Sequence, residues 1–326
     1  MFIRRNFIFS ILITAVFIIL CMVYYNQQNR KYTIDGFIHK ATHYFKNEEY
    51  IRAIRYYKKL ISMGVSDEKT YINAATALIR TGYYENAIEF LHQMEKEFPP
   101  SCEMYYLLAY SYYLKIINGV DKKDFRIPIE YLKKSITLDP RNKASYKFLG
   151  SIYERKRQFE YARQWYKKAS MEDIDNSGEF YGFIANTYFK QRRFEEAMNY
   201  YEKALKENKN YISVYYSIAE IYKQQSNFEK SEEYYKKAIE ISPDYIYPYY
   251  QIGNLYFENN EYNTAIEWYE KALKREPNEE NINFYIGIAY KKINEQKKAV
   301  EHLQKAAYCG NDDALRELKE LSENVL

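Results

Sequence analysis

The sequence contains few of the residues that form tight turns and covalent cross-links. Its 326 residues include 10 glycines, 7 prolines and 3 cysteines. Two-residue hairpin loops depend strongly on glycine, so this scarcity argues against an architecture of many β-hairpins. The three cysteines provide neither a disulfide framework nor a CxxC pair of the kind found in zinc and redox sites. The composition therefore favours a helical protein over one built of β-hairpins.

The sequence also lacks an excess of charge and the motifs of common catalytic sites. Lys and Arg (48) nearly balance Asp and Glu (44), and the charges are interspersed, so we expect no nucleic-acid surface. We find no glycine-rich phosphate loop and no nucleophile elbow. His39 and His43 are one helical turn apart, but no glutamate follows His39 as a zinc protease requires. We therefore predict no catalytic residue, metal, cofactor or small-molecule substrate, and a protein that is not an enzyme.

Residues 7–25, "FIFSILITAVFIILCMVYY", form a long run without charge, glycine or proline. As a helix, 19 residues would extend about 28 Å, close to the thickness of the bilayer's hydrocarbon core. A cleaved signal peptide would have small residues before the cut site, and a lipoprotein signal would have one before Cys21. Leu20 precedes that cysteine. The interpretation that fits best is an uncleaved transmembrane helix.

Arg4 and Arg5 precede this run, and Arg30 and Lys31 follow it. The short tail before the run favours an N-terminus inside the cell and the rest of the chain outside the cytoplasm. This predicts a single-pass protein of a bacterial inner membrane, with a cytosol-facing orientation as the alternative. Residues 26–33 would then be a polar linker that holds the rest of the chain near the membrane.

Related segments recur through the rest of the chain. Three of them are "FEEAMNYYEKALKENKN" from Phe194, "FEKSEEYYKKAIEISPD" from Phe228 and "YNTAIEWYEKALKREPN" from Tyr262. A small residue or a proline occupies the equivalent place eight times, at spacings of 34, 41, 34, 35, 34, 34 and 34 residues. These positions are Ala53, Ala87, Pro128, Ala162, Ala197, Ser231, Ala265 and Ala299. Such a period indicates stacked helical hairpins.

In period and residue pattern the segments resemble the tetratricopeptide repeat family. A small residue recurs at a second place (Ala41, Ala75, Ala109, Gly150, Ala185, Ala219, Gly253, Gly287) and tyrosine follows it three residues later in seven of the eight copies. A helix-ending proline is present as Pro99, Pro140, Pro243 and Pro277. The resemblance implies an all-α, right-handed α-solenoid (superhelix) of eight helix pairs with a C-terminal capping helix, preceded by the transmembrane helix. One hairpin cannot bury its apolar face alone, so adjacent copies must stack.

This register divides the chain into a tail (1–6), the transmembrane helix (7–25), a linker (26–33), the array (34–313) and a cap (314–326). The predicted repeats are 34–67, 68–101, 102–142, 143–177, 178–211, 212–245, 246–279 and 280–313. The third repeat has seven additional residues around "KIINGVDKKDF", and its Pro128 is tolerable only in the first turn of a helix.

The resemblance implies that the first helices of the repeats line a concave groove that holds a segment of a partner protein. Aromatic rings provide contact area, and amides can bond to a peptide backbone. The predicted groove residues are Tyr106, Tyr110, Phe183, Asn186, Tyr216, Glu220, Tyr250, Gln251, Asn254 and Phe284. The family's clamp for an acidic C-terminal tail is not matched, because Ile38, Thr42, Glu103 and Leu107 replace four of its five residues.

The sequence thus predicts a non-enzymatic, membrane-tethered scaffold that binds a protein or peptide partner, in bacterial envelope assembly or secretion. The alternative is a cytosol-facing adaptor or import-type receptor anchored by its N-terminus. An enzyme or regulatory subunit is the third class. Neither the partner's identity nor the oligomeric state follows from the sequence.

Overall fold

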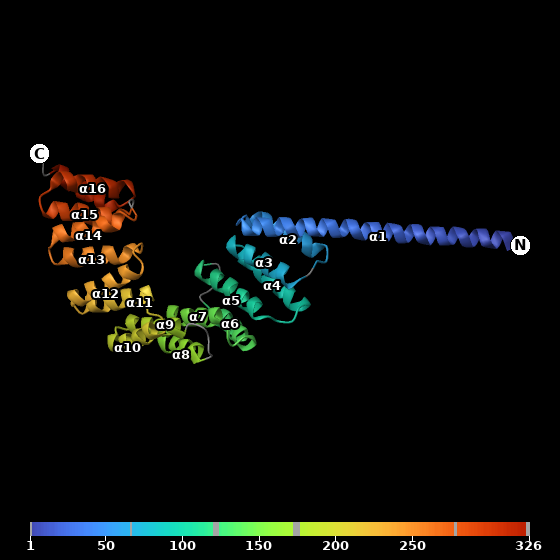
Figure 1. Cartoon of the computed structure of the whole chain (residues 1–326), viewed down its shortest axis with the longest axis horizontal. Helices are drawn as coiled ribbons and strands as arrows, with labels where there is room; N and C mark the ends of the chain where they lie inside the picture. The colour runs from blue at the N-terminus through green and yellow to red at the C-terminus, as the bar shows by residue number, and fades with distance from the viewer. Residues whose placement is uncertain (1, 66, 120–123, 172–176, 277–278, 324–326) are drawn as a thin grey trace. The chain divides into compact units, whose positions relative to one another are not determined.

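A computed structural model of the chain describes the backbone of residues 2–65, 67–119, 124–171, 177–276 and 279–323. Side chains are described for the same residues except 2–18, 177, 280 and 323. Within these ranges the structure has 17 α-helices and no strand (Figure 1). The prediction of an all-α fold is confirmed.

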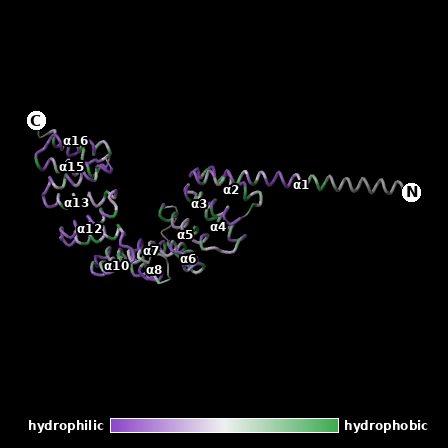
Figure 2. The backbone as a smooth tube through the Cα atoms, in the orientation of Figure 1, coloured by the Kyte–Doolittle hydropathy of each residue, from purple (hydrophilic) through white to green (hydrophobic). Residues whose placement is uncertain are grey.

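The helices group into two compact units, Met1–Ile152 and Tyr153–Leu326. The first unit contains α1 (Phe2–Lys46), α2 (Tyr50–Ser62), α3 (Glu68–Arg80), α4 (Tyr84–Glu97), α5 (Cys102–Ile117), α6 (Arg126–Leu138) and most of α7 (Lys143–Arg155). The end of α1 packs against α2, α3 against α4, and α5 against α6. Figure 2 shows hydrophobic and hydrophilic residues interspersed along these paired helices, as expected of helices with one buried and one exposed face.

In the part of the chain that the structure describes, the second unit contains ten further helices. They are α8 (Phe159–Met171), α9 (Ser177–Lys190), α10 (Phe194–Glu207), α11 (Ile212–Gln224), α12 (Phe228–Ile241), α13 (Ile246–Glu258), α14 (Tyr262–Leu273), α15 (Glu280–Lys292), α16 (Gln296–Tyr308) and α17 (Asp312–Glu323). Here α9 packs on α10, α11 on α12, α13 on α14, and α15 on α16. We call α9, α11, α13 and α15 the first helices of their pairs.

The small residues of the repeat let the two helices of a pair approach closely. Gly253 of α13 lies against the ring of Tyr269 in α14, and a Cβ at Gly253 would be 2.5 Å from two ring carbons. Gly287 of α15 lies in the same way against Leu303 of α16, at 2.7 Å from its Cγ. A larger residue at either glycine would push the helices apart.

The turn between the two helices of a pair places one residue in the left-handed backbone region. This residue recurs at 34- or 35-residue intervals from Arg157 onwards, and six of the eight residues concerned carry side chains. They are Glu48 (φ 60°), Gly82 (81°), Gly119 (74°), Arg157 (57°), Arg192 (58°), Ser226 (58°), Asn260 (63°) and Asn294 (62°). The left-handed residue is therefore a property of the repeat that glycine indicates in only two copies.

Tyrosine forms much of the core. The six largest fully buried side chains are all tyrosines: Tyr71, Tyr146, Tyr166, Tyr201, Tyr235 and Tyr269. The last four occupy the same place in the second helices α8, α10, α12 and α14, and pack between helices with their hydroxyls directed to polar groups. These buried tyrosines therefore serve the packing of one helix on the next.

Pro128 lies in the first turn of α6, where its missing N–H costs no helical hydrogen bond, and its side chain is buried. The insertion that precedes α6 falls partly on residues 120–123, which lie outside the described residues. Residues 172–176, between α8 and α9, and Pro277 also lie outside them.

The predicted transmembrane helix is not supported. Within the residues searched, no helix combines enough length with enough apolar character to cross a membrane. The described side chains of α1 begin at Ile19, and the stretch of 18 residues that starts there includes the polar run from Asn26 to Lys31. That run cannot lie in hydrocarbon without a large cost. The side chains of residues 7–18 of the predicted span lie outside the described residues. The prediction of a single-pass membrane protein is therefore wrong.

The chain's last helix, α17, packs on α16. Its Ala314 and Leu321 are buried against Ala299, Leu303 and Ala306. Lys291 of α15 also forms ion pairs with two glutamates of α17, Glu317 at 2.6 Å and Glu320 at 3.1 Å.

Candidate functional site

The predicted groove residues of the first unit are two tyrosines of α5. The rings of Tyr106 and Tyr110 stack at 6.4 Å, and both meet the edge of Phe148 in α7, at 5.8 Å and 5.7 Å. Burial, with a smaller contribution from Tyr110, raises the pKa of Tyr106. These tyrosines thus form a small aromatic cluster with Phe148 on α5 and α7.

The predicted residues of α9 are half-buried and already engaged within the second unit. Phe183 lies 5.2 Å from the ring of Tyr166 in α8. Asn186 accepts a hydrogen bond at its Oδ1 from the hydroxyl of Tyr201 in α10, at 2.5 Å. Burial raises the pKa of Tyr201 to about 12, so its hydroxyl remains a donor at neutral pH.

The same bond recurs in the next two helix pairs. The Tyr269 hydroxyl in α14 donates to Oδ1 of Asn254 in α13 at 2.7 Å, and Tyr235 in α12 donates to Oε1 of Glu220 in α11. In each pair the tyrosine follows its acceptor by 15 residues. Buried donors therefore fix the orientation of three predicted groove side chains.

A continuous set of hydrogen bonds connects α11 with α13. Gln251 donates from Nε2 to the Tyr216 hydroxyl at 3.2 Å, and its Oε1 accepts from Asn254 at 3.3 Å. The same Oε1 accepts from Nζ of Lys223 at 3.1 Å. Lys223 also lies 3.8 Å from a carboxylate oxygen of Glu258, an ion pair that links the ends of the same two helices.

We call Tyr216, Glu220, Lys223, Tyr250, Gln251 and Asn254 the first-helix row. Five of these six residues are predicted groove residues, and the structure brings them together on α11 and α13. Tyr250 extends the row towards α15 through ring contacts with Tyr269 at 5.9 Å and Tyr285 at 5.8 Å. Phe284 lies beside Tyr285 but packs mainly against the cluster of α16 and α17.

Sequence reasoning missed Lys223 and the internal role of the buried tyrosines. Tyr201, Tyr235 and Tyr269 were not singled out from the sequence, although each stands 15 residues after a polar residue of the predicted groove. That constant offset was the available signal. Lys223 gave none, because its role depends on Gln251 and Glu258 of the next pair.

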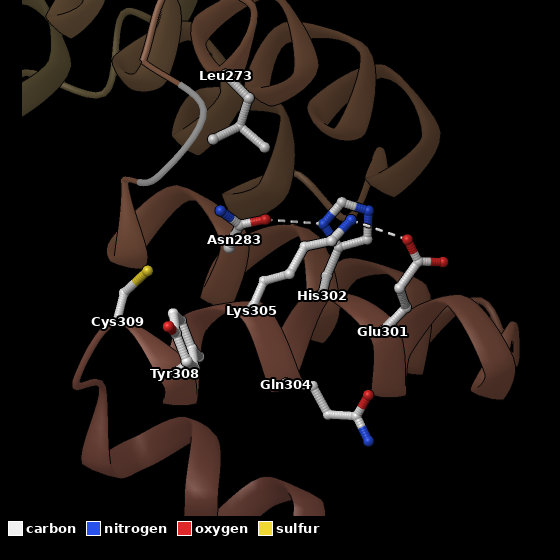
Figure 3. Close-up of a pocket in the computed structure, with 8 residues that line it drawn as sticks. All are labelled: Leu273, Asn283, Glu301, His302, Gln304, Lys305, Tyr308 and Cys309. Atoms are coloured by element: carbon white, nitrogen blue, oxygen red, sulfur yellow. Dashed lines mark hydrogen bonds and ion pairs between the residues drawn. The ribbon is translucent and has the colours of Figure 1, made fainter.

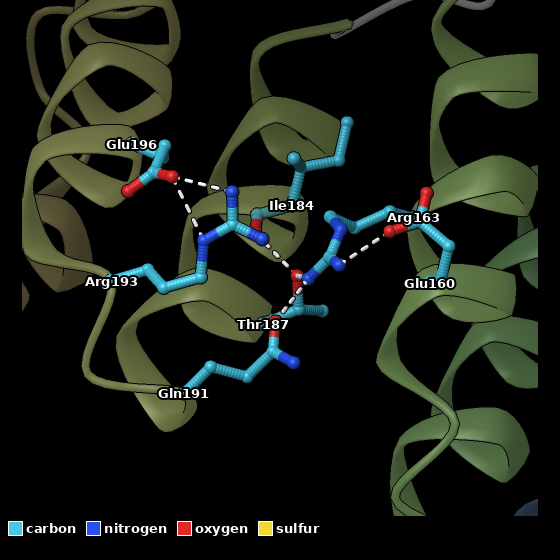
Figure 4. A network of polar contacts seen from close by, with 7 residues as sticks. All are labelled: Glu160, Arg163, Ile184, Thr187, Gln191, Arg193 and Glu196. Atoms are coloured by element: carbon cyan, nitrogen blue, oxygen red, sulfur yellow. Dashed lines mark hydrogen bonds and ion pairs between the residues drawn. The ribbon is translucent and has the colours of Figure 1, made fainter.

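A buried arginine connects α8 with α9 (Figure 4). Arg163 is 2% exposed, and its guanidinium lies 4.2 Å from the centre of the Tyr188 ring. It donates to Gln191 at 2.6 Å, to Thr187 at 3.2 Å and to Glu160 at 2.6 Å. The Arg163 hydrogen bond lowers the pKa of Glu160. These contacts hold α8 against α9.

A cavity of about 690 Å³ lies among α14, α15 and α16, whereas the first-helix row lies on α11 and α13 (Figure 3). The buried Asn283 bonds through Oδ1 to Nδ1 of His302 at 3.0 Å. Burial and the nearby Lys305 lower the pKa of His302, so the imidazole is neutral at pH 7. Lys305 itself pairs with Glu301 at 2.8 Å. The charged and polar groups here pair with one another.

Residues His39 and His43 of α1 stack at 6.3 Å, and Nε2 of His43 lies 3.1 Å from the amide of Asn47. In the part of the chain that was searched, no group of three or more His, Cys, Asp or Glu side chains is placed to hold a metal ion.

Solved structures of similar fold are built from the same helix pairs. The crystal structure of yeast Tom70 matches 86% of this chain at 19% identity, with a TM-score of 0.63. The C-terminal part of a TPR repeat-containing protein from Cytophaga hutchinsonii matches 86% at 17% identity, and Cut9–Hcn1 of the APC/C matches 87% at 14%, each with a TM-score of 0.50. The matches cover 60% of the Tom70 chain, 98% of the Cytophaga chain and 55% of the Cut9–Hcn1 chain. At these identities the likeness concerns the fold.

No curated protein matches the sequence. Family models of the tetratricopeptide repeat match residues 68–93, 179–211, 210–278 and 250–314. The last three ranges include α9 to α16, which carry the first-helix row and its buried tyrosine donors. The chain is therefore built of tetratricopeptide repeats in these segments.

Proposed function

We propose that the chain is a non-enzymatic scaffold whose first-helix row binds an extended segment of a partner protein. Tetratricopeptide repeats bind protein or peptide partners, and an array of helix pairs presents one continuous face along its first helices. The observation that carries the proposal is the first-helix row itself, where Tyr216, Gln251 and Asn254 are hydrogen-bonded into one set.

The row supplies the two features that an extended peptide needs. Tyr216 and Tyr250 offer flat, half-buried rings whose positions are fixed by neighbouring rings, so little side-chain entropy is lost on contact. Gln251 and Asn254 offer amides beside them, and amides can bond to a peptide's main chain. The buried hydroxyl of Tyr269 keeps Asn254 in place before a partner arrives.

Site-specific photocrosslinking in cells tests this proposal. A photoreactive phenylalanine analogue replaces either Tyr247 or Gln224, which are exposed residues at the two ends of the row. The matched controls place it at Lys236 or Glu267, exposed on the second helices α12 and α14. We expect one discrete partner band from the first two positions, weakened by Gln251→Ala, and none from the controls. Equal bands from all four positions, or bands from the second helices alone, would refute the proposal.

A further inference from the structure

Glu220 is the charged member of a set of otherwise neutral acceptors. It occupies the same place in α11 as Asn186 in α9 and Asn254 in α13, and each of the three accepts a bond from a buried tyrosine hydroxyl. Two asparagines thus show that an amide oxygen satisfies the tyrosine in this geometry. The negative charge at Glu220 is therefore not required for the packing of α11 on α12.

The Glu220 carboxylate forms no ion pair with any residue that the structure describes. The closest candidate along its helix, Lys223, is directed to Gln251 at 3.1 Å and Glu258 at 3.8 Å. Glu220 is half-buried. A carboxylate that loses part of its hydration without gaining a cation raises the energy of the free protein, and a cation supplied from outside removes that cost.

Aromatic side chains lie beside Glu220. The Tyr216 ring, one turn before Glu220, lies 5.5 Å from the ring of Tyr235 and 6.3 Å from that of Tyr245. Tyr245 in turn lies 5.5 Å from Tyr247, which is 54% exposed. Tyrosine faces attract ammonium and guanidinium groups, and they also cover the apolar stems of lysine and arginine.

We propose that Glu220 is the docking point for a lysine or arginine side chain of the partner's segment, with Tyr216 and Tyr245 contacting that side chain. The inference rests on the proposed function, because it assigns the chemistry of one residue in the same bound segment. If Glu220 has this role, the first-helix row prefers a bound segment that places a lysine or arginine next to α11. A segment with an acidic or apolar residue there would leave Glu220 half-buried and unpaired.

The test selects binders from a displayed library of random 12-residue peptides on the purified full chain and, in parallel, on its Glu220→Asn variant. Asparagine reproduces the acceptor found at positions 186 and 254, so we expect the variant to keep its bond to Tyr235 and its melting temperature. Glu220→Gln serves in its place if Glu220→Asn does not fold. Glu240→Gln, on an exposed position of α12, removes the same charge elsewhere.

We expect peptides selected on the unaltered chain and on Glu240→Gln to share a lysine or arginine at one position. We expect Glu220→Asn to lose that preference. A synthetic selected peptide should bind Glu220→Asn at least about tenfold more weakly, and replacing its basic residue by norleucine should weaken binding only to chains that retain Glu220. Peptides that compete for the row without any basic preference would overturn this inference and leave the proposed function standing. Failure to select any peptide would overturn both.

Discussion

The hydroxyl of Tyr269 donates a hydrogen bond of 2.7 Å to the side-chain oxygen of Asn254. Tyr269 is fully buried in α14, whereas Asn254 is half-buried on α13. Burial raises the pKa of Tyr269 well above its usual value, so the hydroxyl stays protonated and remains a donor. The bond thus connects the interior of a helix pair with a residue of the first-helix row, and it ties the geometry of the candidate site to the packing of the repeat.

Removing this hydroxyl should lower stability modestly. Tyr269→Phe keeps the ring but deletes the donor to Asn254, so we expect the free energy of unfolding to fall by about 1 kcal/mol. Tyr269→Ala also empties the space of the ring and should cost about 3–5 kcal/mol. Urea titration followed by circular dichroism measures both. Tyr247→Phe, which deletes a hydroxyl from an exposed ring, is the control and should change nothing. If Tyr269→Phe matched that control, the bond would have no energetic role.

Two glycines in helices should respond in opposite directions to the same substitution. A methyl group at Gly253 would overlap the ring of Tyr269, so Gly253→Ala should destabilise the protein by about 1–3 kcal/mol. Gly36 in α1 has nothing within 4 Å of the added carbon, so Gly36→Ala should stabilise its helix by about 0.5–1 kcal/mol. Thermal melting of the two variants checks the prediction. A stabilising Gly253→Ala would show that α13 and α14 can separate without cost.

The buried arginine of α8 should contribute mainly through packing. Its partner Glu160 has a largely exposed side chain, so the carboxylate can return to water when Arg163 is removed. Arg163→Met keeps an unbranched stem over Tyr188 and should cost less than about 1 kcal/mol, whereas Arg163→Ala should cost about 2–3 kcal/mol. Chemical denaturation of the two variants measures these losses in the free energy of unfolding. Equal losses would mean that the bonds to Thr187 and Gln191 carry most of the stabilisation.

The neutral imidazole of His302 should make stability depend on pH. Burial and Lys305 lower its pKa in the folded chain, while in the unfolded chain it returns to about 6.5. Between these two values the unfolded chain binds more protons, so stability rises with pH there and is lost as the pH falls below about 6.5. His302→Gln removes this dependence.

The measurement is the melting temperature at pH 7.5 and pH 5.5. The unaltered chain and the control His39→Gln, at an exposed position, should both lose more stability on acidification than His302→Gln does. The same loss in all three proteins would assign the pH dependence to other groups.

The repeat was predictable from the sequence because its signals are local. The signals are a 34-residue period, small residues at two places in each copy, and a tyrosine three residues after the small residue of the first helix. Each of them involves residues that are close to one another along one or two helices. The left-handed turn was not predictable, since Arg192 and Asn294 adopt positive φ without the glycine that usually indicates it. The predicted membrane span at residues 7–25 was wrong as well, because no helix among the residues searched is long and apolar enough to cross a membrane.

By itself, the sequence determined that this protein is an all-α array of tetratricopeptide hairpins, because helix periodicity and close-packing residues are written along the chain. Only the tertiary structure decided which polar side chains are already satisfied and which are not. Asn254, Gln251 and Lys223 are linked across two helix pairs, and among the described residues no cation pairs with Glu220. Hydrogen bonds between residues 15 to 35 positions apart depend on how one hairpin stacks on the next, and that stacking exists only in the folded array.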